Sequence, residues 1–169
     1  MRILALIGFL AIVGAIGAAV FFLGGFYDVG AIAARPAAVD WALARVRAAS
    51  IARHATDGPP ATLDDPATIQ AGARAFETRG CVVCHGAPGV PYAKFPEGMN
   101  PWPADLNVVA KQSDVAQIFW VVKHGIGMTG MPSFGAEEAP DAELWTIAAF
   151  VKKLPTVSEA DYKAWTAAK

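Results

Sequence analysis

The pentapeptide CVVCH, residues 81–85, holds the only two cysteines of this 169-residue chain and places a histidine directly after the second. Two cysteines can form at most one disulfide, with each other, so no disulfide framework can hold the chain together. A chain of this length can bury a hydrophobic core without cross-links. We therefore expect the two thiols to serve chemistry, and the fold to form around the group that they bind.

This spacing is typical of covalent haem attachment. The thiols of Cys81 and Cys84 can each add to one vinyl group of a haem, which forms two thioether bonds. His85 then lies next to the iron and can supply its proximal nitrogen ligand. We predict one covalently attached haem c, with Cys81 and Cys84 as attachment residues and His85 as the first iron ligand.

Three other uses of two cysteines and a histidine fit the surrounding sequence less well. A thioredoxin-type dithiol belongs to a strand–helix–strand unit, but residues 70–79 predict a helix and no alternating, β-branched strand precedes Cys81. A zinc site needs a fourth ligand, and His124 has no second cluster of ligands near it in the sequence. A structural disulfide would leave His85 without a role.

A candidate for the second iron ligand lies in the segment GMPSF, residues 130–134. Thioether sulfur is a soft ligand, and methionine opposite histidine is a common pairing that raises the reduction potential of haem iron. Met131 is the predicted ligand, because the proline that follows it fixes the backbone directly after the ligand. Met128 is the alternative. We expect His54 and His124 to be surface or interface residues and not iron ligands.

Taken together, these segments resemble the class I cytochrome c family. The similarity covers about residues 66–157 and rests on the haem motif, the Gly-Met-Pro-x-Phe segment and a closing amphipathic helix. The resemblance supports Met131 as the ligand. It also implies that two pairs of residues meet where the first and last helices of the domain cross, and that a glycine lets the two backbones approach. These pairs are Gly72 with Phe76, and Ile147 with Phe150.

The resemblance further implies that a Gly/Pro-rich stretch around Pro101 and Pro103 wraps the haem. One of its carbonyl groups is expected to accept the ring N–H of His85, as partners of ligating histidines usually do. The aromatic candidates for the haem wall are Trp102, Phe119 and Trp120. The chain departs from mitochondrial members of the family in its middle section, which has only three lysines and so no lysine ring around a haem edge.

The predicted fold is all-α, a cytochrome c fold around one covalently bound haem, preceded by a single transmembrane helix. We predict helices at about residues 67–80, 113–124 and 141–154, the last with an apolar stripe at helical spacing. Residues 86–111 would be too long for a plain connection, and we expect them to form a loop against the porphyrin. Ser158 is predicted to begin a short final helix.

The run from Ile3 to Leu23 contains no charged residue over 21 positions. About 20 apolar residues suffice to cross the hydrocarbon layer, whereas a signal peptide has a shorter apolar region with a cleavage site close behind it. The nearest Ala-x-Ala sequence, at residues 31–33, comes eight residues after the run ends. This spacing favours an uncleaved signal-anchor, and it makes the lipid bilayer an expected partner.

We divide the chain into a transmembrane anchor at 1–26, an amphipathic helix and linker at 27–65, the cytochrome c domain at 66–157 and a C-terminal extension at 158–169. The helix that follows Pro36 has two interpretations of equal weight. It rests on the membrane surface through Trp41 and its arginines, or it packs on the haem domain or a partner subunit.

The net charge of −1 gives no basis for nucleic-acid binding. The resemblance implies an electron carrier and not an enzyme, one that shuttles single electrons between membrane redox complexes. A quinol-oxidising complex, a terminal oxidase or a dehydrogenase fits as a partner. We expect the haem domain in the periplasm of a bacterial inner membrane, with the N-terminus cytoplasmic. The alternatives are a fixed haem subunit of a larger respiratory or dehydrogenase complex and, if neither methionine binds iron, a gas-binding or peroxide-reducing haem protein.

Overall fold

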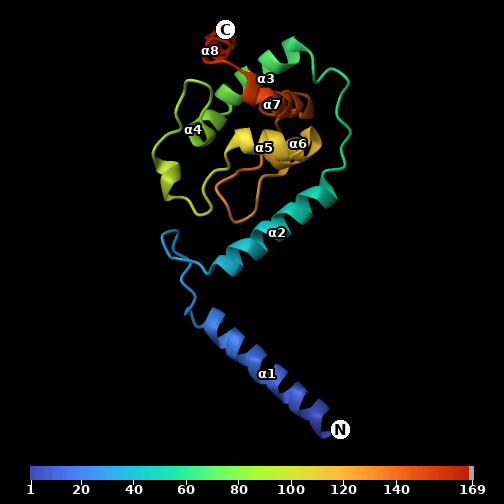
Figure 1. The fold of residues 1–169 in the computed structure, drawn as a ribbon, viewed down its shortest axis with the longest axis vertical. Helices are drawn as coiled ribbons and strands as arrows, with labels where there is room; N and C mark the ends of the chain where they lie inside the picture. Colours follow the sequence, from blue (N-terminus) through green and yellow to red (C-terminus); the bar gives the residue numbers. More distant parts are fainter. Residues whose placement is uncertain (168–169) are drawn as a thin grey trace. The chain divides into compact units, whose positions relative to one another are not determined.

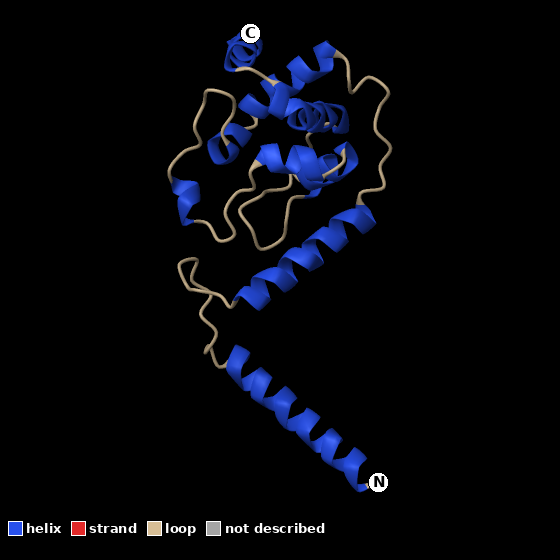
Figure 2. Ribbon diagram, in the orientation of Figure 1, coloured by secondary structure: helices blue, strands red, loops and turns tan. Residues whose placement is uncertain are grey.

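The computed structural model describes residues 1–167, and these contain eight α-helices and two short 3-10 helices but no β-strand (Figure 2). The prediction of an all-α fold is confirmed. The chain divides into two compact units, Met1–Ala34 and Arg35–Lys169. The two units differ in how their apolar side chains are placed, because only the second unit has a buried core.

The first unit consists mainly of α1 (Arg2–Leu23). Every residue of this helix is exposed to solvent, although nearly all of them are apolar. Among residues 1–167, α1 is the one helix that is long and apolar enough to cross a membrane. A helix that is apolar on all sides and has no protein around it is typical of a segment covered by lipid. By length and composition, α1 therefore fits membrane anchoring.

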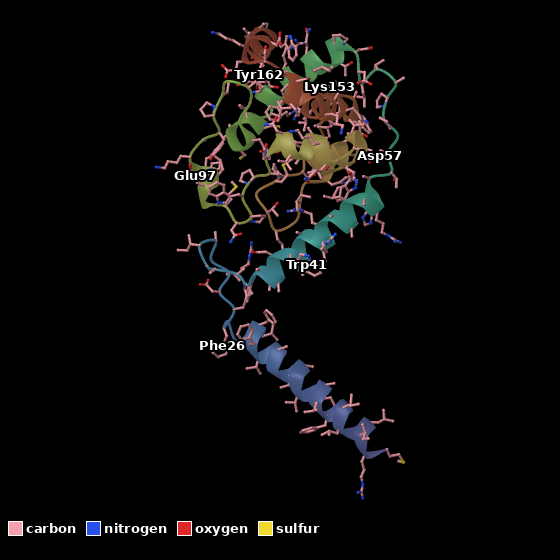
Figure 3. All side chains as sticks on the ribbon, viewed as in Figure 1. Phe26, Trp41, Asp57, Glu97, Lys153 and Tyr162 are labelled. Atoms are coloured by element: carbon pink, nitrogen blue, oxygen red, sulfur yellow. The ribbon has the colours of Figure 1, made fainter. Side chains whose placement is uncertain are left out.

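In the second unit, α2 (Ala37–His54) packs on α6 (Val115–His124). The His54 ring lies 6.1 Å from the ring of Trp120 and is nearly parallel to it. No residue of α2 is buried, and Trp41, labelled in Figure 3, is 65% exposed. α2 thus packs on the helices that follow it, in agreement with one of the two interpretations, but most of its own surface stays exposed.

The core forms where α3 (Pro66–Thr78) crosses α7 (Asp141–Lys153), which lie beside each other in Figure 1. An ideal Cβ on Gly72 would lie 2.0 Å from the carbonyl oxygen of Thr146, so only glycine fits at this crossing. The rings of Phe76 and Phe150 meet there at 5.3 Å. The close helix contact expected from the resemblance is confirmed.

The second layer of the core comes from α6 and from α5 (Leu106–Gln112). Phe119 of α6 stacks on Trp145 of α7 at 3.9 Å. Each helix begins at an aspartate, Asp105 or Asp114, whose side chain accepts a backbone N–H of the first turn. The expectation of a continuous loop over residues 86–111 was wrong, because α5 and η1 (Phe95–Gly98) form within it.

The chain ends in η2 (Leu154–Thr156) and α8 (Glu159–Ala167). Ser158 caps α8 as predicted, since its Oγ accepts the backbone N–H of Asp161 at 3.1 Å. The last two residues of the predicted extension, 168 and 169, lie outside the described residues. Tyr162, labelled in Figure 3, is fully buried, and its hydroxyl donates to the Glu77 carboxylate of α3. Burial raises the pKa of Tyr162. The buried ring and its hydrogen bond to Glu77 anchor α8 to the core.

Candidate haem site

The pentapeptide forms the single turn α4 (Cys81–His85), between two glycines in the left-handed region. Gly80 has φ 75° and Gly86 has φ 67°, backbone angles that glycine adopts without strain. Val82 is buried and fixes the turn to the core, whereas Cys81, Cys84 and His85 are half-buried. The two thiols are not joined in a disulfide. The turn therefore presents both sulfurs and the imidazole from one rigid element.

Burial changes the pKa of two side chains of this turn. It raises the pKa of the Cys81 thiol to about 12. It also lowers the pKa of His85, which favours the neutral imidazole that binds metal.

The orientation of His85 is set by a hydrogen bond to the loop before α5. Its Nδ1 lies 3.0 Å from the carbonyl oxygen of Ala104. Because a carbonyl oxygen can only accept, Nδ1 carries the proton and Nε2 keeps its lone pair for a metal. The expected carbonyl partner in the Gly/Pro-rich stretch is confirmed, and it is that of Ala104.

A cavity of about 320 Å³ lies beside this histidine. Its lining includes Cys84, His85, Tyr92 and Trp102, but neither Cys81 nor Met131. Tyr92 and Trp102 are largely exposed, at 45% and 62%. Trp102 thus lies beside His85. The other two aromatic candidates lie elsewhere: Phe119 is buried against Trp145, and Trp120 contacts the rings of His54 and His124.

The two candidate methionine ligands differ in burial. Met131 is half-buried and packs against the core cluster. Met128 is fully exposed and has φ 60°, so its side chain makes no contribution to the core. Of the two sulfur atoms, that of Met131 is the one held against the body of the domain.

The backbone around Met131 is held by a compact set of hydrogen bonds. The Thr129 hydroxyl donates to the carbonyl oxygen of Ile126 at 2.8 Å and accepts the backbone N–H of Met131 at 3.2 Å. The backbone N–H of Ile126 donates to the Met131 carbonyl at 3.1 Å. An ideal Cβ on Gly125 would lie 2.8 Å from that same carbonyl oxygen. Thr129 was not among the site residues predicted from the sequence, although its place two residues before the predicted ligand was a usable signal.

An ion pair joins the residues just before α4 to α7. Arg79, two residues before Cys81, donates from Nε and from the terminal Nη2 to the two carboxylate oxygens of Glu143, at 2.8 and 3.1 Å. The hydrogen bond from Arg79 lowers the pKa of Glu143. This bidentate pair fixes the residue from which the pentapeptide departs.

Glu143→Gln is expected to lower the thermal unfolding temperature by a few degrees at neutral pH. Because the pKa of Glu143 is lowered in the folded state, the pair contributes above the ordinary carboxyl value of 4.5 and is lost as the pH falls through the folded-state pKa. Unfolding curves of the two proteins, followed by circular dichroism, should converge in acid. A difference that stayed constant through the acid range would show that the carboxylate charge is not responsible.

The residues of this turn and of the loop that holds Met131 fit a covalently attached haem. Two unpaired thiols three residues apart and an imidazole whose Nδ1 is bonded to a carbonyl lie on one turn, and Cys84 and His85 of this turn line a cavity. A half-buried thioether supplies a soft second donor. A zinc site does not fit, since residues 1–167 contain no group of three or more His, Cys, Asp or Glu side chains that could hold a metal ion.

Comparison with known proteins gives a family for this domain. A family model described as cytochrome C oxidase, cbb3-type, subunit III matches residues 67–151, just over half of the chain. The match begins in α3, includes the pentapeptide and Met131, and ends in α7. No curated protein and no solved structure matches the chain. The chain therefore belongs to this family of c-type cytochrome domains and carries covalently bound haem c, with which it transfers electrons.

Proposed function

We propose that this protein is a membrane-tethered cytochrome c that shuttles single electrons between redox complexes on the periplasmic side of a bacterial inner membrane. The observation that carries the proposal is the presence, in one chain, of a c-type cytochrome domain and an apolar helix able to cross a membrane. One arginine precedes this helix and four follow it by residue 53, so charge does not decide the orientation. The cytoplasmic N-terminus of the proposal follows from the haem domain, which is expected outside the cytoplasm.

In this proposal Cys81 and Cys84 attach the haem, while His85 and Met131 hold the iron. Haem c supplies a one-electron couple between ferric and ferrous iron. The chain contributes rigidity: the Ala104 carbonyl fixes the imidazole, and Thr129 fixes the backbone of the methionine. Ligands that keep their positions in both oxidation states keep the reorganisation small, which suits a carrier.

The segment between α1 and α2, residues 24–36, acts as a tether in this account, because α2 packs on α6. A tether keeps the haem domain near the membrane surface and raises its effective concentration at membrane-bound partners. A quinol-oxidising complex, a terminal oxidase or a dehydrogenase would serve as donor or acceptor. Of the three lysines in the middle section, Lys123 is engaged by Asp141 at 2.7 Å. Docking through a ring of free lysines is therefore not part of the proposal.

A second candidate function is a fixed haem subunit of a larger respiratory or dehydrogenase complex. The description of the matching family as an oxidase subunit favours it, and α2 offers an open surface on which a partner subunit could pack. A gas-binding or peroxide-reducing role requires a sixth iron site without methionine. The half-buried position of Met131 in a hydrogen-bonded loop argues against that role.

The shuttle and the fixed subunit are separated by solubilising native membranes in mild detergent. The full chain is followed by its covalent haem after native electrophoresis. A shuttle is expected to migrate at the size of the single chain, and to be reduced and reoxidised by the separated complexes when it is added back. Co-migration with one complex in constant proportion would contradict the shuttle and support the fixed subunit.

A further inference from the structure

A third methionine, Met99, contacts the loop that carries the predicted iron ligand. We name residues 125–132 the ligand loop. An ideal Cβ on Gly130 would lie 2.6 Å from the sulfur of Met99, so the half-buried Met99 side chain lies directly on the backbone of this glycine. Gly130 precedes Met131 in the chain, and the contact is therefore one residue away from the predicted ligand.

The loop that carries Met99 is in turn held by Arg35, the first residue of the second unit. The Arg35 guanidinium, just before α2, donates from Nη2 to the side-chain oxygen of Asn100, the residue after Met99. Its Nε donates to Asp40 at 2.9 Å, and only 23% of the side chain is exposed. The Arg35 guanidinium thus makes two hydrogen bonds, one of them to a carboxylate, and such charge-assisted bonds hold a side chain firmly.

Few residues of the ligand loop are buried. Four of them, Gly127, Met128, Gly130 and Pro132, are exposed, and only Gly125 is fully buried. Its internal hydrogen bonds run between Ile126, Thr129 and Met131. Loops with few buried contacts open at low free-energy cost. The Met99 side chain contacts this loop at Gly130. If the loop opened there, Met131 would move.

We infer that Arg35 and Met99 are positioning residues for Met131 as an iron ligand. In this inference Arg35, which lies just before α2, helps to hold Met131 in place. The inference rests on the proposed role of Met131. The contacts run from Arg35 to Asn100, from Met99 to Gly130, and along the backbone to Met131. A ligand held in this way leaves the iron rarely, which keeps the haem closed to external ligands.

The test uses full-length holoprotein in detergent and measures two properties of the haem. These are the near-infrared sulfur-to-iron charge-transfer band of the ferric state and the rate of carbon monoxide binding to the ferrous state. Arg35→Ala and Met99→Ala are each expected to weaken the band and to raise the carbon monoxide rate about tenfold, the size of effect that follows from losing one charge-assisted hydrogen bond or its dependent contact. Met99→Leu keeps the side-chain volume and is expected to behave like the unaltered protein.

Arg45→Ala is the matched control, because it removes an arginine of α2 whose guanidinium lies 5.8 Å from the Trp41 ring. It should leave both properties unchanged. Unaltered band and rate in both Arg35→Ala and Met99→Ala, with Met131→Ala losing the band, would overturn this inference and leave the proposed ligation intact. Loss of the band in Met99→Leu, with the band retained in Met131→Ala, would instead show that Met99 is the ligand, and both proposals would fail.

Discussion

Gly72→Val is expected to leave no folded haem domain in the membrane. Even an ideal Cβ at this position would lie 2.0 Å from the carbonyl oxygen of Thr146 and 2.6 Å from its carbonyl carbon. These are backbone atoms of another helix, so no side-chain rotation relieves the clash. Overpacking against side chains already costs about 1–3 kcal/mol, and a domain of this size has only about 5–15 kcal/mol of stability in total.

The loss should be measured as the amount of covalent haem that co-migrates with the full chain, together with the thermal unfolding of any protein recovered. Gly72→Ala is expected to lose at least about 3 kcal/mol of stability by the same clash. Gly58→Val is the control, because nothing lies within 4 Å of a Cβ at Gly58 and its φ is not positive. Normal haem content and unfolding temperature in Gly72→Val would contradict the close crossing of α3 and α7.

Met131→Ala is expected to convert the protein from a closed, six-coordinate haem to one that is high-spin and binds carbon monoxide. Removal of the thioether deletes the soft ligand that raises the potential of haem iron. The sulfur-to-iron band should disappear completely, and the reduction potential should fall. Absorption spectra of both oxidation states and a potentiometric titration measure these changes.

Met128→Ala is the matched control, since Met128 lies in the same loop but is fully exposed. It should keep the band and the potential of the unaltered protein. The opposite pattern, with the band lost in Met128→Ala and kept in Met131→Ala, would assign the ligand to Met128. It would also require the ligand loop to rearrange, because the Met128 side chain makes no contribution to the core in this structure.

The helices that were predicted well from the sequence are those whose apolar residues recur at helical spacing. The apolar stripe of α7 and the helix before Cys81 follow from helical periodicity, and both were confirmed. The role of Gly72 was implied by the resemblance to class I cytochromes c, and the structure shows the close contact that requires glycine there. The predicted loop over residues 86–111 was wrong because α5 is only seven residues long. So short a helix leaves almost no periodicity, and its one signal, the cap at Asp105, was not used.

Candidate ligands could be named from the sequence, whereas the residues that hold them in place could not. The thiols, the imidazole and Met131 stand in short motifs. A carbonyl partner for His85 was expected, but Ala104 could not be chosen, because the path of a Gly/Pro-rich loop depends on tertiary contacts. The link from Arg35 through Asn100 joins residues 65 positions apart. No periodicity or motif relates such residues, so this part of the site is visible only in three dimensions.

The most direct test of the account is the absorption spectrum of the purified full-length protein, visible and near-infrared, oxidised and reduced, before and after carbon monoxide. A covalently bound, low-spin haem with the sulfur-to-iron band, unaffected by carbon monoxide, is the result that the account predicts. A high-spin haem that reacts readily with carbon monoxide would contradict the proposed histidine–methionine ligation and the carrier function. The absence of covalent haem would contradict the assignment of the pentapeptide itself.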